Sequence, residues 1–125
     1  MMKNHPDTDR IGQEGEDIAC RALRERGYRI IARNWSCRFG EIDIIAMDKE
    51  DVVFVEVKGR ESDVFGTPEE AIGPAKQKKI SKAALHYLQE KGLGGRNARF
   101  DVVTIRFMPQ DTQVQLIRNA FDLSW

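Results

Sequence analysis

The chain has 125 residues, 41% of them hydrophobic and 32% charged, with twenty basic and twenty acidic side chains. This length and composition predict one folded domain and exclude a disordered chain. The zero net charge excludes a uniformly basic nucleic-acid coat and an acidic tail protein, although it is compatible with a local basic patch on a neutral surface.

The first half of the chain predicts one helix followed by three strands. Apolar residues recur every three or four positions over 10–26, which is the spacing of a helix with one buried face. Residues 28–35, 40–47 and 52–58 are rich in isoleucine, valine and aromatic residues, which favour strands. The short polar segment at 48–51 predicts a hairpin between the second and the third of these strands.

The second half predicts a polar loop, a long helix and two further strands. The loop covers 59–67, and the proline that follows it suits the first position of a helix. The helical pattern runs over 68–91, with an interruption near Gly73 and Pro74. Residues 99–107 predict a fourth strand, and 114–118 predict a weaker fifth strand.

The order of predicted elements, α-β-β-β-α-β-β, indicates an α/β domain with one mixed sheet flanked by helices. We expect this domain to cover residues 10–125, after a polar N-terminal tail at 1–9. No segment has the apolar length of a membrane span or of a signal peptide. Cys20 and Cys37 form no CxxC pair, so we expect a cytoplasmic protein with two reduced thiols and no contact with a membrane.

Charged side chains interrupt the apolar third strand. Glu56 and Lys58 point to the same face, because strand side chains alternate. Charges beside a core cost several kcal/mol unless they are paired or bind a metal ion. One interpretation is a salt bridge between the two residues at the strand end, with Asp43 capping a turn.

The second strand offers the other interpretation. By alternation, Glu41 and Asp43 share one face, and Ile42 and Ile44 share the other. If the hairpin register places Asp43 beside Glu56, the two carboxylates repel each other unless a proton or a divalent cation lies between them. Carboxylate oxygens and a backbone carbonyl are suitable ligands for Mg²⁺ or Mn²⁺, which activate water for phosphodiester hydrolysis.

Six short segments carry a family resemblance. They are residues 15–19 (GEDIA), 40–45 (GEIDII), 54–58 (FVEVK), 65–68 (FGTP), 99–103 (RFDVV) and 119–121 (NAF). Together and in this order they resemble the YraN family of small bacterial proteins, which are similar to Holliday-junction resolvases. Asp43 followed by Glu56-Val57-Lys58 also resembles the PD-(D/E)XK nuclease signature, with Ile42 in place of its proline. The resemblance implies a PD-(D/E)XK nuclease-like core.

The resemblance also implies a site and a reaction. Asp43 and Glu56 would be metal ligands, with the Val57 carbonyl as a third ligand and Glu16 as an auxiliary ligand from the first helix. Lys58 would be the catalytic lysine. The implied protein is an endonuclease that uses Mg²⁺ or Mn²⁺ to hydrolyse phosphodiester bonds in DNA, with branched DNA as a candidate substrate and a homodimer as the candidate assembly.

Basic residues predict where DNA phosphates would bind. Six arginines fall within eighteen residues that contain one acid: Arg21, Arg24, Arg26, Arg29, Arg33 and Arg38. We predict nucleic-acid contacts at Arg33, Arg38 and Arg60, and at Lys76 and Gln77 on the second long helix. The alternative is an ordinary solvated surface, with the stem of Lys76 packed and its ammonium group in water.

Three other acidic residues have more than one interpretation. Glu16 borders the apolar face of the first helix, so it either tilts toward the sheet or lies in solvent near the helix N-terminus. Glu41 is either a metal ligand or a structural ion-pair partner. Asp101 is expected to be structural, in contact with Arg99 or Arg60.

A second class of function also fits the sequence. The chain would then be a non-catalytic nucleic-acid-binding module, or an adaptor of a DNA-processing complex, that retains the carboxylates without cleaving DNA. A third interpretation is a protein-interaction domain. Metal binding and DNA binding distinguish the three.

Overall fold

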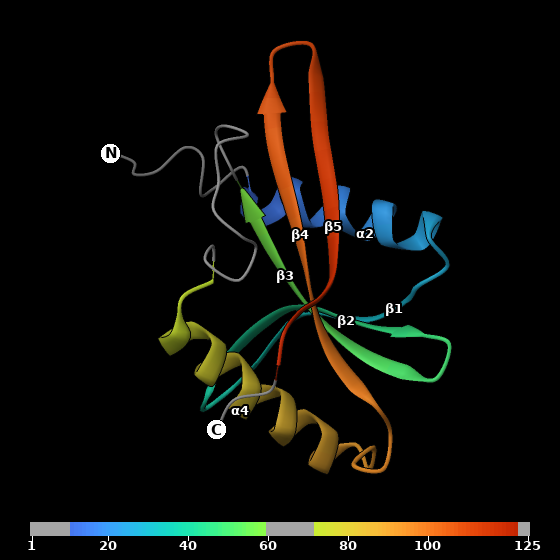
Figure 1. Ribbon diagram of the computed structural model, residues 1–125, viewed down its shortest axis with the longest axis vertical. Coiled ribbons are helices and arrows are strands. Elements are labelled where there is room, and N and C mark those ends of the chain that lie inside the picture. The colour runs from blue at the N-terminus through green and yellow to red at the C-terminus, as the bar shows by residue number, and fades with distance from the viewer. Residues whose placement is uncertain (1–10, 60–71, 123–125) are drawn as a thin grey trace.

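The computed structural model describes residues 11–59 and 72–122, so the predicted tail at 1–9 and Arg60 lie outside the described residues. The elements are η1 (Ile11–Gly15), α2 (Glu16–Glu25), β1 (Arg29–Cys37), β2 (Gly40–Asp48), β3 (Asp51–Gly59), α4 (Pro74–Glu90), β4 (Ala98–Met108) and β5 (Asp111–Phe121). Figure 1 shows their arrangement. The predicted order of elements is confirmed.

The ends of three elements differ from the prediction. The first helix begins as a π-helical turn, η1, before α2. Helix α4 begins at Pro74 with Gly73 as its N-cap, because proline is well suited to the first helical position; the part predicted at 68–71 lies outside the described residues. Strand β5 is longer than the predicted 114–118, because it pairs with β4 along almost its whole length.

The strands form one mixed sheet in the order β1-β2-β3-β4-β5. Neighbouring strands are antiparallel except β3 and β4, which are parallel. Figure 1 shows α2 and α4 on opposite sides of this twisted sheet. Neither helix, nor any other helix within the described part of the chain, is long and apolar enough to cross a membrane.

Each helix covers its own hydrophobic core. The core on the α4 side includes Ile42, Phe54, Ile80, Ala84, Tyr87 and Phe100. The core on the α2 side includes Ala19, Leu23, Ile44, Val55, Val57 and Ile105. Strand β3 is buried on both faces by this arrangement, which explains why its sequence is an almost continuous apolar run. Glu56, between Val55 and Val57, therefore faces the α4 side.

The alternation of β2 breaks at Asp43. Ile42 packs in the α4-side core and Ile44 in the α2-side core, so the prediction that they share a face is wrong. Asn34 of β1 lies between the two residues that pair with Ile42 and Ile44, and its φ of 52° is left-handed. The ladder between β2 and β3 also ends here, at the pair of Ile44 and Val55. The backbone therefore changes direction around Asp43.

A cluster of charged residues joins β2, β3 and β4 near the hairpin turn. We call it the Arg99 network. The guanidinium of Arg99 lies 2.7 Å from Asp48, 3.0 Å from Asp51 and 3.1 Å from Asp101. The hydroxyl of Tyr28 donates a hydrogen bond of 2.8 Å to Asp101, which is fully buried. The expected structural role of Asp101, in contact with Arg99, is confirmed.

Candidate active site

Asp43 and Glu56 meet where β2 and β3 separate. Beyond the pair of Ile44 and Val55, the side chain of Asp43 replaces the backbone of β2 as the partner of β3. The Val57 N–H donates a hydrogen bond of 2.8 Å to Asp43 Oδ2. Asp43 also shares a side-chain hydrogen bond with Glu56. The structure thus brings the two carboxylates together, as the second of the two interpretations of the sequence requires.

Burial makes this pair of carboxylates difficult to ionise together. Glu56 is only 6% exposed, and burial, followed by the negative charge of Asp43, raises the pKa of Glu56 from 4.5 to about 7. Burial also raises the pKa of Asp43, although the Val57 N–H offsets part of this shift. These directions correspond to a protonated Glu56 that donates its hydrogen to an ionised Asp43. Near neutral pH, the pair therefore holds an exchangeable proton.

Lys76 supplies the nearest positive charge. Its ammonium, in the first turn of α4, lies 2.5 Å from Glu56 Oε2, and its side chain is 53% exposed. Burial opposes the charge of Lys76, but the hydrogen bond to Glu56 and the charges of Glu56 and Asp43 raise its pKa overall. Lys76 was predicted to contact a phosphate; in the structure it contacts a carboxylate of the candidate site.

Glu16 approaches Asp43 from α2. Its carboxylate is 6% exposed and accepts a hydrogen bond of 2.8 Å from Asn34 Nδ2, while Arg33 lies 3.5 Å away. Burial raises the pKa of Glu16, Asn34 lowers it, and the charge of Asp43 raises it further. The tilt of Glu16 toward the sheet is therefore confirmed, whereas the solvent-exposed alternative is not.

Asn34 is the residue that sequence reasoning missed. It orients Glu16 and lies across from Asp43. The signal was an asparagine in the middle of an otherwise apolar and basic strand, because asparagine is disfavoured in strands but tolerates a left-handed backbone. The role of the residue follows only from its position opposite the break in β2.

Lys58 lies near the end of β3, two residues after Glu56. It is partly exposed, and its backbone pairs with Thr104 of β4. By strand alternation, its side chain leaves the sheet on the same side as that of Glu56. No ion pair or hydrogen bond joins the Lys58 side chain to any residue within 11–59 or 72–122. Its ammonium group is therefore available to a ligand of the site.

Glu41 and the predicted nucleic-acid contacts lie on several elements. The exposed Glu41 raises the pKa of both Asp43 and Lys76 through its charge. Arg33 contacts Asp17 and Glu16 beside α2. Two other predicted contact residues have partners away from the carboxylates. The guanidinium of the exposed Arg38 lies 4.8 Å from the ring centre of Phe39. Gln77 Nε2 donates a hydrogen bond of 2.7 Å to the carbonyl of Ile72, just before α4. Arg60 is outside the described residues.

The donor atoms of the site suit a small divalent cation. Among the residues that the structure describes, no three His, Cys, Asp or Glu side chains group closely enough to hold a metal ion by themselves. The remaining set is the carboxylates of Asp43 and Glu56 and the adjacent main chain of Val57. Hard oxygen donors of this kind match Mg²⁺ or Mn²⁺, which retain several waters and need few protein ligands. The residues present therefore fit such an ion.

Comparison with known proteins places the chain in a family. The model of UPF0102, an uncharacterised protein family, matches residues 15–105. A UPF0102 protein of Syntrophus aciditrophicus is 53% identical over 93% of this chain and 91% of its own length. UPF0102 proteins of Geobacter sulfurreducens and Persephonella marina are 47% and 46% identical, over 92% and 91% of this chain and 91% and 95% of their own lengths. The chain therefore belongs to the UPF0102 family, the YraN family that its six sequence segments resemble.

Proposed function

We propose that the protein is a metal-dependent endonuclease that hydrolyses phosphodiester bonds in DNA, with branched DNA as a candidate substrate. The observation that carries the proposal is the hydrogen bond from the Val57 N–H to Asp43, which fixes one carboxylate against the buried carboxyl of Glu56. Buried carboxylates with raised pKa values are unfavourable for folding, and they occur most often at sites that bind or react.

Each residue then has a defined task. Asp43, Glu56 and the Val57 carbonyl would hold Mg²⁺ or Mn²⁺, and the ion would supply a Lewis acid that activates water and neutralises phosphate charge. The side chain of Lys58, which forms no ion pair or hydrogen bond with the described residues, would orient the attacking water or bind the phosphate. Glu16 would act as an auxiliary ligand or proton acceptor beside Asp43.

Lys76 has a task in the absence of the ion. Its ammonium contacts Glu56 and is attracted by the negative charge of the Asp43 and Glu56 pair, which favours the two carboxyl groups staying together before a cation binds. Because the side chain is half-exposed, it can move into solvent when a divalent ion neutralises the carboxylates in its place. Lys76 would then lie beside the site, where a phosphate of the substrate is within its reach.

A cleavage assay tests the proposed function. Linear duplex, single-stranded and four-way-junction DNA are incubated with the protein and Mg²⁺ or Mn²⁺, and products are separated on denaturing gels. We expect Glu56→Gln, Asp43→Asn and Lys58→Met each to lower the rate by about 100-fold or more, and chelation of the metal to abolish it. Glu50→Gln is the matched control, because Glu50 is an exposed acid in the hairpin turn.

Two outcomes would contradict the nuclease. One is the absence of cleavage of all three substrates with either metal. The other is cleavage that Glu56→Gln leaves at the level of Glu50→Gln, because a contaminating nuclease would give that result. Salt-sensitive DNA binding without any cleavage would instead support the nucleic-acid-binding module.

A further inference from the structure

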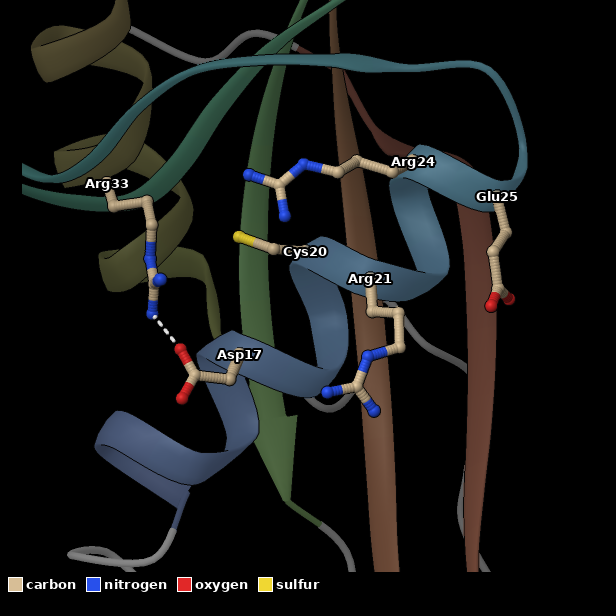
Figure 2. Close-up of a pocket in the computed structure, with 6 residues that line it drawn as sticks. All are labelled: Asp17, Cys20, Arg21, Arg24, Glu25 and Arg33. Carbon is tan, nitrogen blue, oxygen red and sulfur yellow. Dashed lines mark hydrogen bonds and ion pairs between the residues drawn. The ribbon is translucent and has the colours of Figure 1, made fainter.

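Two adjoining cavities run along the exposed side of α2. The first has a volume of about 450 Å³, and Figure 2 shows the residues that line it: Asp17, Cys20, Arg21, Arg24, Glu25 and Arg33. The second has a volume of about 440 Å³ and is lined by Gly12, Gln13, Glu16, Asp17, Arg33 and Asn34. Both cavities are lined by Asp17 and Arg33, so they adjoin at this ion pair, and we call the two together the groove.

The first cavity is positively charged where it is open to a ligand. Asp17 accepts a hydrogen bond of 2.9 Å from Arg33, so these two charges balance each other. No ion pair or hydrogen bond joins the side chain of Arg21 or Arg24 to another residue of the described ranges. In Figure 2 the guanidinium of Arg24 extends over Cys20 toward Arg33, and the carboxylate of Glu25 points away from Arg24. Within residues 11–59 and 72–122, these two guanidinium groups thus form no ion pair, although Glu25 lines the same cavity.

Glu16 connects the second cavity to the candidate active site. Glu16 and Asn34 line the second cavity, and Glu16 is close enough to Asp43 for the charge of Asp43 to raise its pKa. A ligand in the groove would therefore extend from the carboxylates of the site, past Arg33, to Arg21 and Arg24.

We propose that this arginine groove, formed by Arg21, Arg24 and Arg33, binds the phosphodiester backbone of a DNA strand next to the segment held at Asp43. The choice of ligand rests on the proposed function. Arg21 and Arg24 contact phosphates of the strand, because each can present several donors to one phosphate. Arg33 is fixed by Asp17 and positions the strand between the groove and the site. Contacts to the backbone carry no sequence information, so binding in the groove is independent of sequence.

DNA binding without cleavage tests the groove. Fluorescence anisotropy measures the binding of labelled duplex and junction DNA to the full chain in EDTA, across a range of salt concentrations. We expect the double variant Arg21→Gln, Arg24→Gln to bind about 10-fold more weakly and to lower the slope of log affinity against log salt by about two, which is one per lost phosphate contact.

The control removes the same charge elsewhere. Lys49→Gln, Lys91→Gln neutralises two exposed residues outside the arginine groove, and we expect it to keep the wild-type salt slope. Arg21→Lys, Arg24→Lys keeps the charge and should recover most of the affinity. Urea unfolding midpoints verify that all variants fold.

The outcomes separate the groove from the nuclease. Equal losses in the groove and control variants, or no DNA binding by the wild type, would overturn the arginine groove. Wild-type cleavage that the Arg21→Gln, Arg24→Gln variant retains, together with unchanged binding, would overturn the groove and leave the nuclease intact. Loss of affinity in that variant without wild-type cleavage of any substrate would support the groove and overturn the nuclease.

Discussion

The sheet holds two clusters of acidic residues that differ in how their charges are satisfied. In the Arg99 network, one guanidinium forms ion pairs with three carboxylates. Its hydrogen bond to Asp48 lowers the pKa of that carboxylate. At the candidate site, burial raises the pKa of both Asp43 and Glu56. The only ammonium in contact with Glu56 among the described residues is half-exposed.

This difference separates a structural role from a functional one. The Arg99 network has a structural role, because the loss of Arg99 would leave the fully buried Asp101 without its guanidinium partner. The burial of Asp43 beside Glu56 instead lowers the stability of the fold. Buried carboxylates of this kind occur most often where they bind a ligand or take part in a reaction. The comparison predicts that removing the guanidinium of Arg99 strongly destabilises the first cluster, whereas neutralising Glu56 stabilises the second.

The largest effect is expected in the Arg99 network. Arg99→Met leaves the fully buried Asp101 without its guanidinium partner, which costs about 3–5 kcal/mol of unfolding free energy. The matched change at the candidate site, Lys76→Met, removes a half-exposed partner and should cost about 1 kcal/mol or less. Urea unfolding at pH 7 measures both. Equal losses of unfolding free energy in Arg99→Met and Lys76→Met would contradict the proposed difference between the two clusters.

The next effect is a pH dependence at Glu56. This residue titrates at 4.5 in the unfolded chain and at about 7 in the fold, so between these values the folded state binds more protons and stability falls as pH rises. The stability that protonated Glu56 contributes is fully present below pH 4.5 and is lost above about pH 7. Glu56→Gln mimics the protonated form, so it should gain about 1–3 kcal/mol over the wild type at pH 8 and almost nothing at pH 4.

Urea unfolding of wild type and Glu56→Gln, from pH 4 to pH 8, measures this difference. A difference that stays constant across the range would contradict the raised pKa of Glu56. The Arg99 network should respond in the opposite direction, because the pKa of Asp48 is lowered. Its stabilisation is present at neutral pH and is lost as the pH falls below 3.8, the ordinary value for an aspartate.

A smaller effect is expected at Asn34. Asn34→Ala removes the hydrogen bond to Glu16 and places an alanine at a φ of 52°, so it should cost about 1–2 kcal/mol. Asn34→Gly removes the same hydrogen bond at a backbone conformation that glycine adopts without strain, and should cost less than the alanine variant. If both variants unfold at the wild-type urea concentration, Asn34 does not hold Glu16 in place.

Local patterns predicted much of this architecture. Hydrophobic periodicity gave the order of elements, because each helix and strand has to bury one face or two. The meeting of Asp43 and Glu56 followed from the hairpin, because a short turn fixes the register of two strands. The family resemblance added Glu16, whose spacing on the first helix alone was compatible with solvent.

The rest depends on tertiary packing that no local pattern encodes. Lys76 contacts Glu56 because α4 packs against β2 and β1 with its first turn near the end of β3. A helical pattern does not specify which strand its first turn meets. Ile42 and Ile44 point to opposite cores because the backbone turns at Asp43, opposite the left-handed Asn34. A strict alternation of strand residues cannot predict such a break.

Calorimetric titration with Mn²⁺ is the most direct test of the candidate metal site. Wild type is compared with Asp43→Asn and with Asp51→Asn, which removes a carboxylate from the Arg99 network. We expect wild type and Asp51→Asn to bind Mn²⁺ with the same affinity, and Asp43→Asn to bind at least about 100-fold more weakly. No binding by the wild type, or equal binding by all three proteins, would contradict a metal site at Asp43 and Glu56.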